Sequence, residues 1–380
     1  MSKINILFIS NDDRKMAGAS HSLYNMIRSV KNNVHPIVLM AEMGDTYDFF
    51  MSHDIECIVV PFMQLYYFVN DKNPITRFLR YLKHIVEFER SEIRCAEKVY
   101  QLLKDRDIRI VHSNSTIMTI GERIAQRLKA KHVWHVREFL DLDFNITPFR
   151  GRKRLENKVH KADATIAITN PVYKHWHLEK MSNSYVLWNA VRSKSEICFI
   201  KNKLPYFLFC AAQLSKMKGA DAAIRCFSQS GLSENGYKLI MAGRCSESYK
   251  QELSNIVHEY NCEESIKFIG YQKDLKSLMT SATAFLMTSL NEGMGRTTIE
   301  AMFYGCPVIA RHSGGTVDFM KDSNTGFFFD TEEECIRLIK KVAQEMPRTV
   351  ILNAHHLAKE SFSEESYGSK LLNIYNQLIK

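Results

Sequence analysis

Two glutamates, Glu292 and Glu300, lie in a short glycine-bearing stretch, "NEGMGRTTIEAMFYG", whose residue types suit a polar ligand. Gly293 and Gly295 let the backbone approach a bound group closely. A helix is expected to begin at Arg296, and a helix start offers unpaired N–H groups and a partial positive charge to a phosphate. Carboxylates would repel that phosphate, so we expect them to accept hydrogen bonds from vicinal hydroxyls beside it. A nucleotide-sugar carries both kinds of group.

The same stretch also has a purely structural interpretation. Acidic residues are common near helix starts because of the helix dipole, and the helix would then only bury "IEAM". Arg296 and Glu300 are four residues apart and share a face of the helix in either case. The residue types alone leave both interpretations open.

The elements that position this stretch alternate along the whole chain. Apolar runs of strand length, such as "INILFIS", "KHVWHV", "YFLFCAA" and "AFLMTS", are separated by amphipathic segments of helix length. This pattern predicts parallel sheets covered by helices on both faces, the doubly wound α/β architecture. We expect seven strands before residue 190 and five after residue 205. Ligands of such sheets bind at the carboxyl ends of the strands, so functional residues are expected in the loops there.

The length of 380 residues exceeds one ordinary core and predicts two domains. We expect a Rossmann-like domain at residues 1–195 and a second at 204–360, facing each other across a central cleft. The polar stretch "SKSEICFIKNKLP" is the expected linker. Residues 361–380 predict a closing helix, with Ser363 as N-cap, that packs back toward the N-terminal domain.

Composition excludes several classes of protein. A chain with 45% hydrophobic and 24% charged residues is typical of globular proteins, and no run approaches the roughly 18 apolar residues of a spanning helix. The N-terminus reads as a buried strand and not as a signal peptide, so we expect a cytoplasmic location. Nine scattered cysteines indicate reduced thiols and no zinc site. The net charge of +9 favours an acidic partner or is a solubilising excess, and no recognition module indicates nucleic acid.

A family resemblance joins these observations. The stretch "NEGMGRTTIEAMFYGCPVIA" resembles the E-x7-E signature of retaining glycosyltransferases of family 4, which have the GT-B fold. The spacing from Glu292 to Glu300 fits, as does the "SGG" at residues 313–315. The segments "AAQLSKMKGAD", "LIMAGR", "IKFIGYQKDL" and "VLWNAV" are similar to further parts of the family pattern. The resemblance covers nearly the whole second half of the chain and, more loosely, the first.

The resemblance implies a role in donor binding for each matching residue. Glu300 would hold the ribose hydroxyls of the donor, and Glu292 would hold hydroxyls of the transferred sugar. Lys218 would neutralise the diphosphate leaving group. The other donor-binding positions that the resemblance implies are Gly18, Gln213, Arg244, Tyr271, Gly293, Met294, Gly295, Arg296 and Thr297.

Two of these positions depart from the family pattern. Gln213 stands where the family has an arginine, and a neutral amide supplies no charge to the leaving group. Either Arg244 or Arg296 would compensate, or leaving-group stabilisation is weaker in this chain. Near Gly18, the usual double glycine is reduced to Ala-Gly.

The first half contributes histidines at two expected strand ends. His135 in "VWHVRE" matches the histidine that the family places at the reacting sugar, which implies a catalytic role beside Lys218 and Glu292. His112 lies in "IVHSNS". Each histidine also has the simpler interpretation of a polar residue that caps a strand, which we favour for His112 and not for His135.

The activity implied by the resemblance is retaining transfer of a hexosyl or N-acetylhexosaminyl unit. The donor would be a nucleotide diphosphate sugar, with a UDP-sugar favoured, and the acceptor a hydroxyl of a saccharide or lipid-linked molecule in surface polysaccharide synthesis. The resemblance implies neither a metal nor a cofactor. The alternative is a non-catalytic polyanion- or membrane-binding protein on a degenerate transferase fold, for which Gln213 is the only support in the sequence.

Other motifs carry competing interpretations. "DLD" at residues 141–143 matches the metal-binding motif of GT-A transferases, but that fold is a single domain and two halves are expected here. "HWH" at residues 175–177 is a possible metal pair or part of a helix surface. The two glutamates would suit glycoside hydrolysis only if one were a general acid.

One stretch of the first half, "PFMQLYYFVNDKNPITRFLRYLKHIVEFER", is dense in aromatics and carries Arg77, Arg80 and Lys83. A basic amphipathic stretch of this kind would rest on an anionic bilayer. The acceptor would then be a lipid-linked saccharide at the cytoplasmic face. It would equally suit a helix that buries one face in the first domain. Both interpretations stay open at this point.

Overall fold

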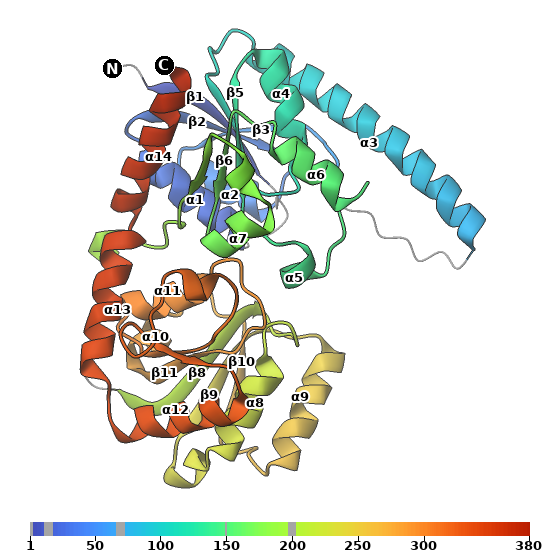
Figure 1. Cartoon of the computed structure of the whole chain (residues 1–380). Coiled ribbons are helices and arrows are strands. Elements are labelled where there is room, and N and C mark those ends of the chain that lie inside the picture. Colours follow the sequence, from blue (N-terminus) through green and yellow to red (C-terminus); the bar gives the residue numbers. More distant parts are fainter. Residues whose placement is uncertain (1–2, 11–17, 66–72, 149, 197–202) are drawn as a thin grey trace. The chain divides into compact units, whose positions relative to one another are not determined.

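The computed structural model describes residues 3–10, 18–65, 73–148, 150–196 and 203–380 (Figure 1). The chain divides into two compact units: unit 1 comprises Met1–Asn189 and Tyr367–Lys380, and unit 2 comprises Ala190–Ser366. Each unit has a parallel sheet with helices on both faces (Figure 1). The predicted doubly wound α/β architecture is therefore confirmed. The expected linker lies partly outside the described residues, because 197–202 are not among them.

Unit 1 is built on a seven-stranded sheet in the order β3-β2-β1-β4-β5-β6-β7, in which every described pair is parallel. Its strands are β1 Ile4–Ile9, β2 Val34–Met40, β3 Glu56–Val59, β4 Ile110–Ser113, β5 Lys131–Val136, β6 Ala164–Ala167 and β7 Ser184–Val186. Its helices are α1 Gly18–Val30, α2 Asp45–Met51, α3 Pro74–Leu103, α4 Ile120–Leu128, α5 Asp141–Phe144, α6 Arg152–Val159, α7 Asn170–His175 and the 3₁₀ turn η1 Leu178–Lys180.

The two faces of this sheet are covered by different helices. On one face, Cys95, Val99 and Leu103 of α3 pack with Ile124 of α4 against apolar strand residues. The other face meets the closing helix α14 Glu364–Ile379, whose Tyr375 reaches β4. Apolar residues that recur every three or four positions in these helices produce this burial.

Unit 2 is built on a six-stranded parallel sheet in the order β10-β9-β8-β11-β12-β13. Its strands are β8 Leu204–Gln213, β9 Lys238–Arg244, β10 Ile266–Gly270, β11 Ala282–Met287, β12 Val308–Arg311 and β13 Phe327–Phe329. Its helices are α8 Ala220–Gln229, α9 Glu247–Glu259, α10 Lys276–Ser281, α11 Arg296–Phe303, α12 Glu332–Gln344, α13 Arg348–Ser361 and the 3₁₀ turns η2 Lys194–Glu196, η3 Leu232–Asn235 and η4 Gly314–Asp318.

One strand of unit 2 differs from the expectation of five. The three residues of β13 add a sixth strand, which pairs with β12 at the edge of the sheet. A run this short carries no periodicity of its own, so the sequence does not distinguish it from a turn. Phe327 and Phe329 nevertheless belong to the apolar core under α8, α9 and α12.

Two helix ends confirm the sequence expectations. Gly305 adopts a left-handed conformation, with φ of +64°, directly after α11. Ser363 lies immediately before α14, and its Oγ accepts a hydrogen bond from the backbone N–H of Ser366 at 3.4 Å. Both residues end or begin a helix as their types favour.

The eight cysteines among the described residues are free thiols, and six of them are buried. Within the described part of the chain, every helix is too short or too polar to cross a bilayer.

Candidate active site

The sheet of unit 2 reverses its strand order between β8 and β11, which lie side by side although three helices and two strands separate them in the chain. Loops leave such a switch point in opposite directions and open a site at the carboxyl ends of the strands. The loop after β8 carries Lys218, and the loop after β11 carries Glu292. The topology therefore brings two of the predicted residues to one place.

These two loops are held together by hydrogen bonds to backbone carbonyls. Thr288 Oγ1 donates a hydrogen bond to the carbonyl of Gly219 at 2.7 Å, and the Leu290 N–H donates to the carbonyl of Met217 at 3.0 Å. Gly219 has φ of +72°, and a Cβ there would collide with Thr288. This locked pair of loops places Lys218 Nζ 2.7 Å from Glu292 Oε1, with both side chains partly exposed.

A third loop, after β12, contacts the backbone of Glu292. The Gly315 N–H donates to the carbonyl of Glu292 at 2.6 Å. Gly314 has φ of +64°, and a Cβ on Gly314 or Gly315 would collide with the backbone of Glu292 or Gly293. The "SGG" of the sequence is thus a close approach of two backbones, for which only glycine has room.

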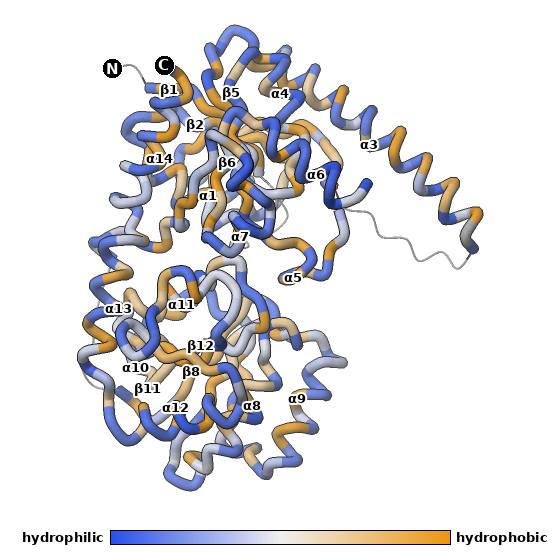
Figure 2. Tube along the Cα trace, in the orientation of Figure 1, coloured by the Kyte–Doolittle hydropathy of each residue, from blue (hydrophilic) through white to orange (hydrophobic). Residues whose placement is uncertain are grey.

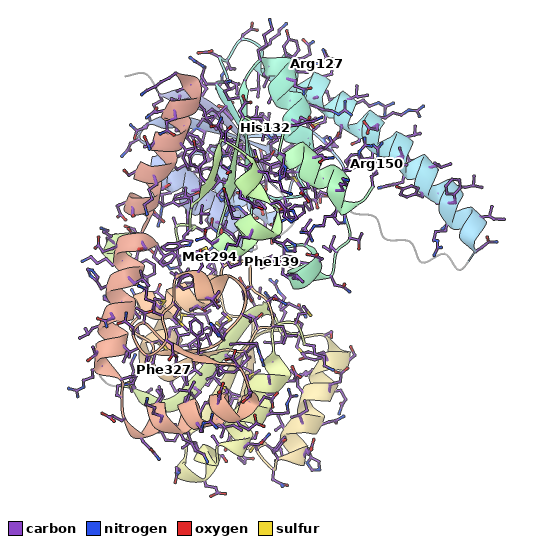
Figure 3. All side chains as sticks on the ribbon, viewed as in Figure 1. Arg127, His132, Phe139, Arg150, Met294 and Phe327 are labelled. Atoms are coloured by element: carbon purple, nitrogen blue, oxygen red, sulfur yellow. The ribbon has the colours of Figure 1, made fainter. Side chains whose placement is uncertain are left out.

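The helix predicted after this loop begins at the expected residue. Gly295 is the N-cap of α11, with φ of +79°, and its carbonyl accepts from the Thr298 N–H at 3.0 Å. Gly293 and Met294 come just before α11 and are buried, and Thr297 is half-buried in the first turn. Met294 is labelled in Figure 3. This helix start therefore follows closely in the chain after Glu292, the partner of Lys218.

Glu300 lies one turn into α11 and is 8% exposed. Its Oε1 is 3.2 Å from Arg192 and 3.6 Å from Nε of Arg296. Arg192 also donates from Nε to the Tyr304 hydroxyl at 3.0 Å. Burial opposes the charge of Arg192, but Glu300 and Tyr304 outweigh it and raise its pKa. Burial lowers the pKa of Arg296, against the pull of Glu300.

Two residues of the cluster around Glu300, Arg192 and Tyr304, were not predicted from the sequence. Arg192 comes directly after "VLWNAV", a segment already similar to the family pattern, and this position is the only signal in the sequence. Nothing in its spacing from Glu300 indicates the contact, because tertiary folding alone joins them.

Gln213 and Arg244 are direct neighbours on β8 and β9, as partners in the parallel register. Both side chains are exposed. The Arg244 guanidinium lies 4.3 Å from the ring centroid of Tyr271, in the loop after β10. Arg244 forms no ion pair with any described carboxylate, whereas Arg296 faces Glu300. The neutral amide and this arginine therefore meet at the carboxyl edge of the sheet.

The predicted residues of unit 1 form a separate group. His135 lies in β5 and is fully buried; burial, and next the charge of Arg137, lower its pKa well below 6.5. His112 in β4 is equally buried and hydrogen-bonded to Tyr375. Gly18 is the first residue of α1, and residues 11–17, which precede it, lie outside the described residues. How His135 and Gly18 relate to the residues of unit 2 stays a prediction.

Glu138, which follows the histidine strand, is also buried. Its carboxylate accepts hydrogen bonds from the Thr116 N–H at 3.1 Å and the Thr116 hydroxyl at 2.8 Å. The Ser115 hydroxyl donates to it at 3.2 Å. Burial raises its pKa despite these donors. Glu138 thus ties the loop after β4 to the loop after β5.

The competing metal motifs are engaged by protein partners. Asp141 pairs with Arg152 at 2.6 Å and with His175 at 2.8 Å. Asp143 accepts from two backbone N–H groups, and burial raises its pKa to about 7. His177 contacts Glu156 at 3.0 Å. Across the described ranges, no three His, Cys, Asp or Glu side chains cluster as metal ligands would.

Comparison with known proteins identifies the second unit. Residues 194–355 match the family model described as "Glycosyl transferases group 1". The chain carries a group 1 glycosyltransferase domain. This domain contains Lys218, Glu292 and Glu300, so the residues brought together by β8 and β11 lie within the matched region.

Sequence relatives match part of the chain. The chain is 31% identical over 152 residues to the human "Alpha-1,3/1,6-mannosyltransferase ALG2", covering 37% of this chain and 36% of that protein. It is 27% identical over 169 residues to the Escherichia coli "O-antigen biosynthesis glycosyltransferase WclY", covering 44% and 46%. The chain thus spans less than half the length of these relatives.

Solved structures extend the likeness to the whole fold. Anabaena HepE, solved in complex with UDP and glucose, superposes with a TM-score of 0.78 at 17% identity and covers 98% of this chain and 100% of its own. TarM superposes with a TM-score of 0.74 at 13% identity, with 99% of both chains covered. The fold of both units is therefore that of GT-B proteins.

Proposed function

We propose that this protein is a retaining glycosyltransferase of family 4. It moves a hexosyl or N-acetylhexosaminyl unit from a nucleotide diphosphate sugar to a hydroxyl of a saccharide or lipid-linked acceptor. The observation that carries the proposal is the Lys218–Glu292 pair at the switch point of unit 2, next to a glycine-bounded helix start that carries Glu300. The O-antigen relative favours a role in surface polysaccharide synthesis.

The reaction breaks the bond between the sugar and the diphosphate through a state with oxocarbenium character. Lys218 stabilises the departing diphosphate, and the start of α11 adds the partial charge of its N–H groups. Glu292 competes for Lys218 when the site is empty and accepts hydroxyls of the sugar when the phosphate takes the lysine. Glu300, whose charge two arginines offset, accepts the ribose hydroxyls. The acceptor attacks the same face that the phosphate leaves, and the phosphate takes its proton.

Arg244 is the residue that replaces the missing arginine at Gln213. It stands beside Gln213 in the strand register, and the Tyr271 ring holds it in place. It has no carboxylate partner among the described residues, so its charge remains available for a phosphate. Arg296 is the weaker candidate because Glu300 already offsets its charge.

The donor we favour is a UDP-sugar. HepE, which shares the fold, is solved in complex with UDP-glucose. A panel of UDP-, GDP- and ADP-sugars in a thermal-shift assay tests this choice. A donor at about 100 times its Kd stabilises the protein by about 2.7 kcal/mol, which raises the melting temperature of a unit this size by roughly 5–10 °C. We expect one UDP-sugar to give such a shift.

The alternative, a polyanion-binding protein on a degenerate fold, predicts a different outcome of the same panel. Polyphosphate would then stabilise the protein in a salt-sensitive manner, and no sugar nucleotide would exceed the shift given by pyrophosphate. That result would contradict the transferase proposal.

We further propose that unit 1 contacts an anionic bilayer through α3. Ile75, Phe78, Leu79, Leu82 and Val86 recur at helical spacing, and each is at least 42% exposed. The first turns of α3 extend away from the sheet of unit 1 (Figure 1), and apolar and polar positions alternate along them (Figure 2). An exposed apolar stripe of this length on a helix favours a docking surface.

The basic residues around this apolar stripe favour an anionic partner. Residues 74–86 contain Arg77, Arg80 and Lys83 and no acidic residue. All three basic side chains are exposed beside the stripe. Apolar side chains flanked by basic ones are the arrangement that inserts among anionic lipid headgroups. Residues 66–72 of the same sequence stretch, which include the aromatic residues Tyr66, Tyr67 and Phe68, lie outside the described residues.

Reversing the charge of Arg77, Arg80 and Lys83 to glutamate is expected to release the protein from anionic vesicles. Each basic residue near such a surface contributes about 1 kcal/mol, so the partition coefficient should fall by at least tenfold. Co-sedimentation with vesicles of phosphatidylcholine and phosphatidylglycerol measures it, with pure phosphatidylcholine as reference.

The matched control reverses three exposed basic residues of unit 2, namely Lys250, Arg337 and Lys340, and gives the same net charge. This control should bind the vesicles better than the α3 variant. Equal partitioning of the α3 variant and the unmodified protein would remove the bilayer proposal. A concentration-dependent dimer that Phe78→Ser abolishes would assign the stripe to self-association.

A further inference from the structure

Three fully buried side chains connect the closing helix to the candidate catalytic histidine within unit 1. The Tyr375 hydroxyl of α14 lies 2.7 Å from Nδ1 of His112 in β4. Nε2 of His112 lies 3.2 Å from Nδ1 of His135 in β5. All three residues have 0% exposure. Bulk solvent does not reach the three groups, and they hydrogen-bond to one another.

Arg137 fixes the direction of these hydrogen bonds. Its NH2 group lies 3.3 Å from the same Nδ1 of His135. A guanidinium only donates, so this Nδ1 must accept, and the ring proton of neutral His135 then resides on Nε2. Arg137 is itself held by Asn114 Oδ1 at 2.9 Å and Asn189 Oδ1 at 2.6 Å.

The same reasoning determines the proton on His112. Its Nε2 faces an accepting nitrogen and therefore donates, so its Nδ1 accepts from the Tyr375 hydroxyl. Burial, and next the charge of Arg137, lower the pKa of His112 well below its usual value and keep the ring neutral. His132, labelled in Figure 3, and Tyr367 of α14 complete the titratable groups around this chain of bonds.

These hydrogen bonds leave the Nε2–H group of His135 without an acceptor among the described residues. Nε2 of His135 is buried and has no hydrogen-bond partner among the described residues. A buried N–H without an acceptor is unfavourable, so an oxygen of a ligand is its expected partner. Under the proposed function, on which this step rests, that oxygen is a hydroxyl of the transferred sugar or of the acceptor.

We propose that Tyr375 is a positioning residue: through His112 it holds His135 in the tautomer that presents Nε2–H to the substrate. Without the Tyr375 hydroxyl, His112 can carry its proton on Nδ1. Its unprotonated Nε2 would then face His135 as an acceptor. His135 would then be drawn to protonate Nδ1, against Arg137, and would lose its Nε2 donor. A helix remote in sequence thus acts together with Arg137 to hold the protonation of the candidate catalytic group.

The Tyr375→Phe variant, which removes one oxygen and keeps the ring, tests this proposal. We expect kcat to fall about fivefold to tenfold, the net value of one hydrogen bond, with KM for the donor unchanged. The ¹⁵N spectrum of labelled histidines should show Nε2–H alone for His135 in the unmodified protein and a mixture in the variant. Loss of the signal in His135→Asn assigns it.

The matched control is Tyr185→Phe. Tyr185 also joins a strand to α14, because its hydroxyl donates to Gln377 at 3.3 Å, but it lies outside the chain of bonds. This control should keep both kcat and the His135 spectrum. A role in docking α14 alone would instead make the two variants behave alike, which would overturn the proposal.

A second pair of variants gives a conservative rescue. His112→Gln retains a donor toward His135 and an acceptor toward Tyr375, so it should keep the His135 tautomer better than His112→Leu. The ¹⁵N measurement does not depend on turnover, so it remains decisive if the protein transfers no sugar. Nδ1–H on His135 in the unmodified protein would overturn the proposal outright.

Discussion

Replacing Lys218 with methionine is expected to slow sugar transfer by about 10²–10³-fold, the usual cost of removing one preorganised charge at a developing anion. Methionine keeps the length of the side chain and removes its charge. The Lys218–Glu292 pair is partly exposed, so its loss should alter folding stability little. The rate of nucleoside diphosphate release measures the effect, and the melting temperature checks the fold.

Lys216→Met is the matched control. It removes a lysine two residues earlier in the same loop, where the side chain is exposed, and it should keep the rate of the unmodified protein. In the same assay, Arg244→Met should lose rate while Arg337→Met does not, if Arg244 supplies the charge missing at Gln213. A Lys218→Met enzyme within threefold of the unmodified one would show that this lysine does not bind the leaving group.

Exchanging Glu300 for glutamine should weaken binding of the whole nucleotide by about 10- to 100-fold. Hydrogen bonds to a charged group contribute about 1.5–3 kcal/mol, and the amide lacks the charge that the ribose hydroxyls would meet. Titration calorimetry with UDP and with uridine separates the contributions. Glu300→Gln should weaken both ligands equally, whereas Lys218→Met should weaken UDP and leave uridine unchanged.

The control for Glu300 is Glu332→Gln, which alters another arginine pair of unit 2. Glu332 lies 2.6 Å from Arg225 on the outer helices and should not affect either ligand. If Glu300→Gln binds uridine as tightly as the unmodified protein does, Glu300 serves only to neutralise Arg192 and Arg296.

Alternation of apolar runs and amphipathic segments was sufficient to predict the fold class. The buried strands of a parallel sheet are apolar along their whole length, and this signal is strong in β1, β8 and β11. β13 was missed because three residues carry no period. From the sequence, the start of α3 showed only an amphipathic pattern. A helix that buries its apolar face and a helix that exposes it have similar spacing of apolar residues, so the sequence did not distinguish the two.

The sequence predicted the contacts of the site between residues that are close in the chain. It did not predict the contacts between distant segments. The turn at Gly295, the helix start and the shared face of Arg296 and Glu300 follow from residues within one turn of each other. The contact of Arg192 with Glu300 joins distant segments. So does the contact of Tyr375 with His112. Such contacts depend on strand order and helix docking, which no single stretch of sequence encodes.

The most direct test of the central claim is sugar transfer by the unmodified protein and by a Glu292→Gln/Glu300→Gln variant, with the donor chosen by thermal shift. The double variant should fold like the unmodified protein, because glutamine preserves the shape of each side chain. The account predicts release of nucleoside diphosphate and a glycosylated product whose anomeric configuration matches the donor, and loss of both in the double variant. Undiminished transfer by the double variant would contradict the account.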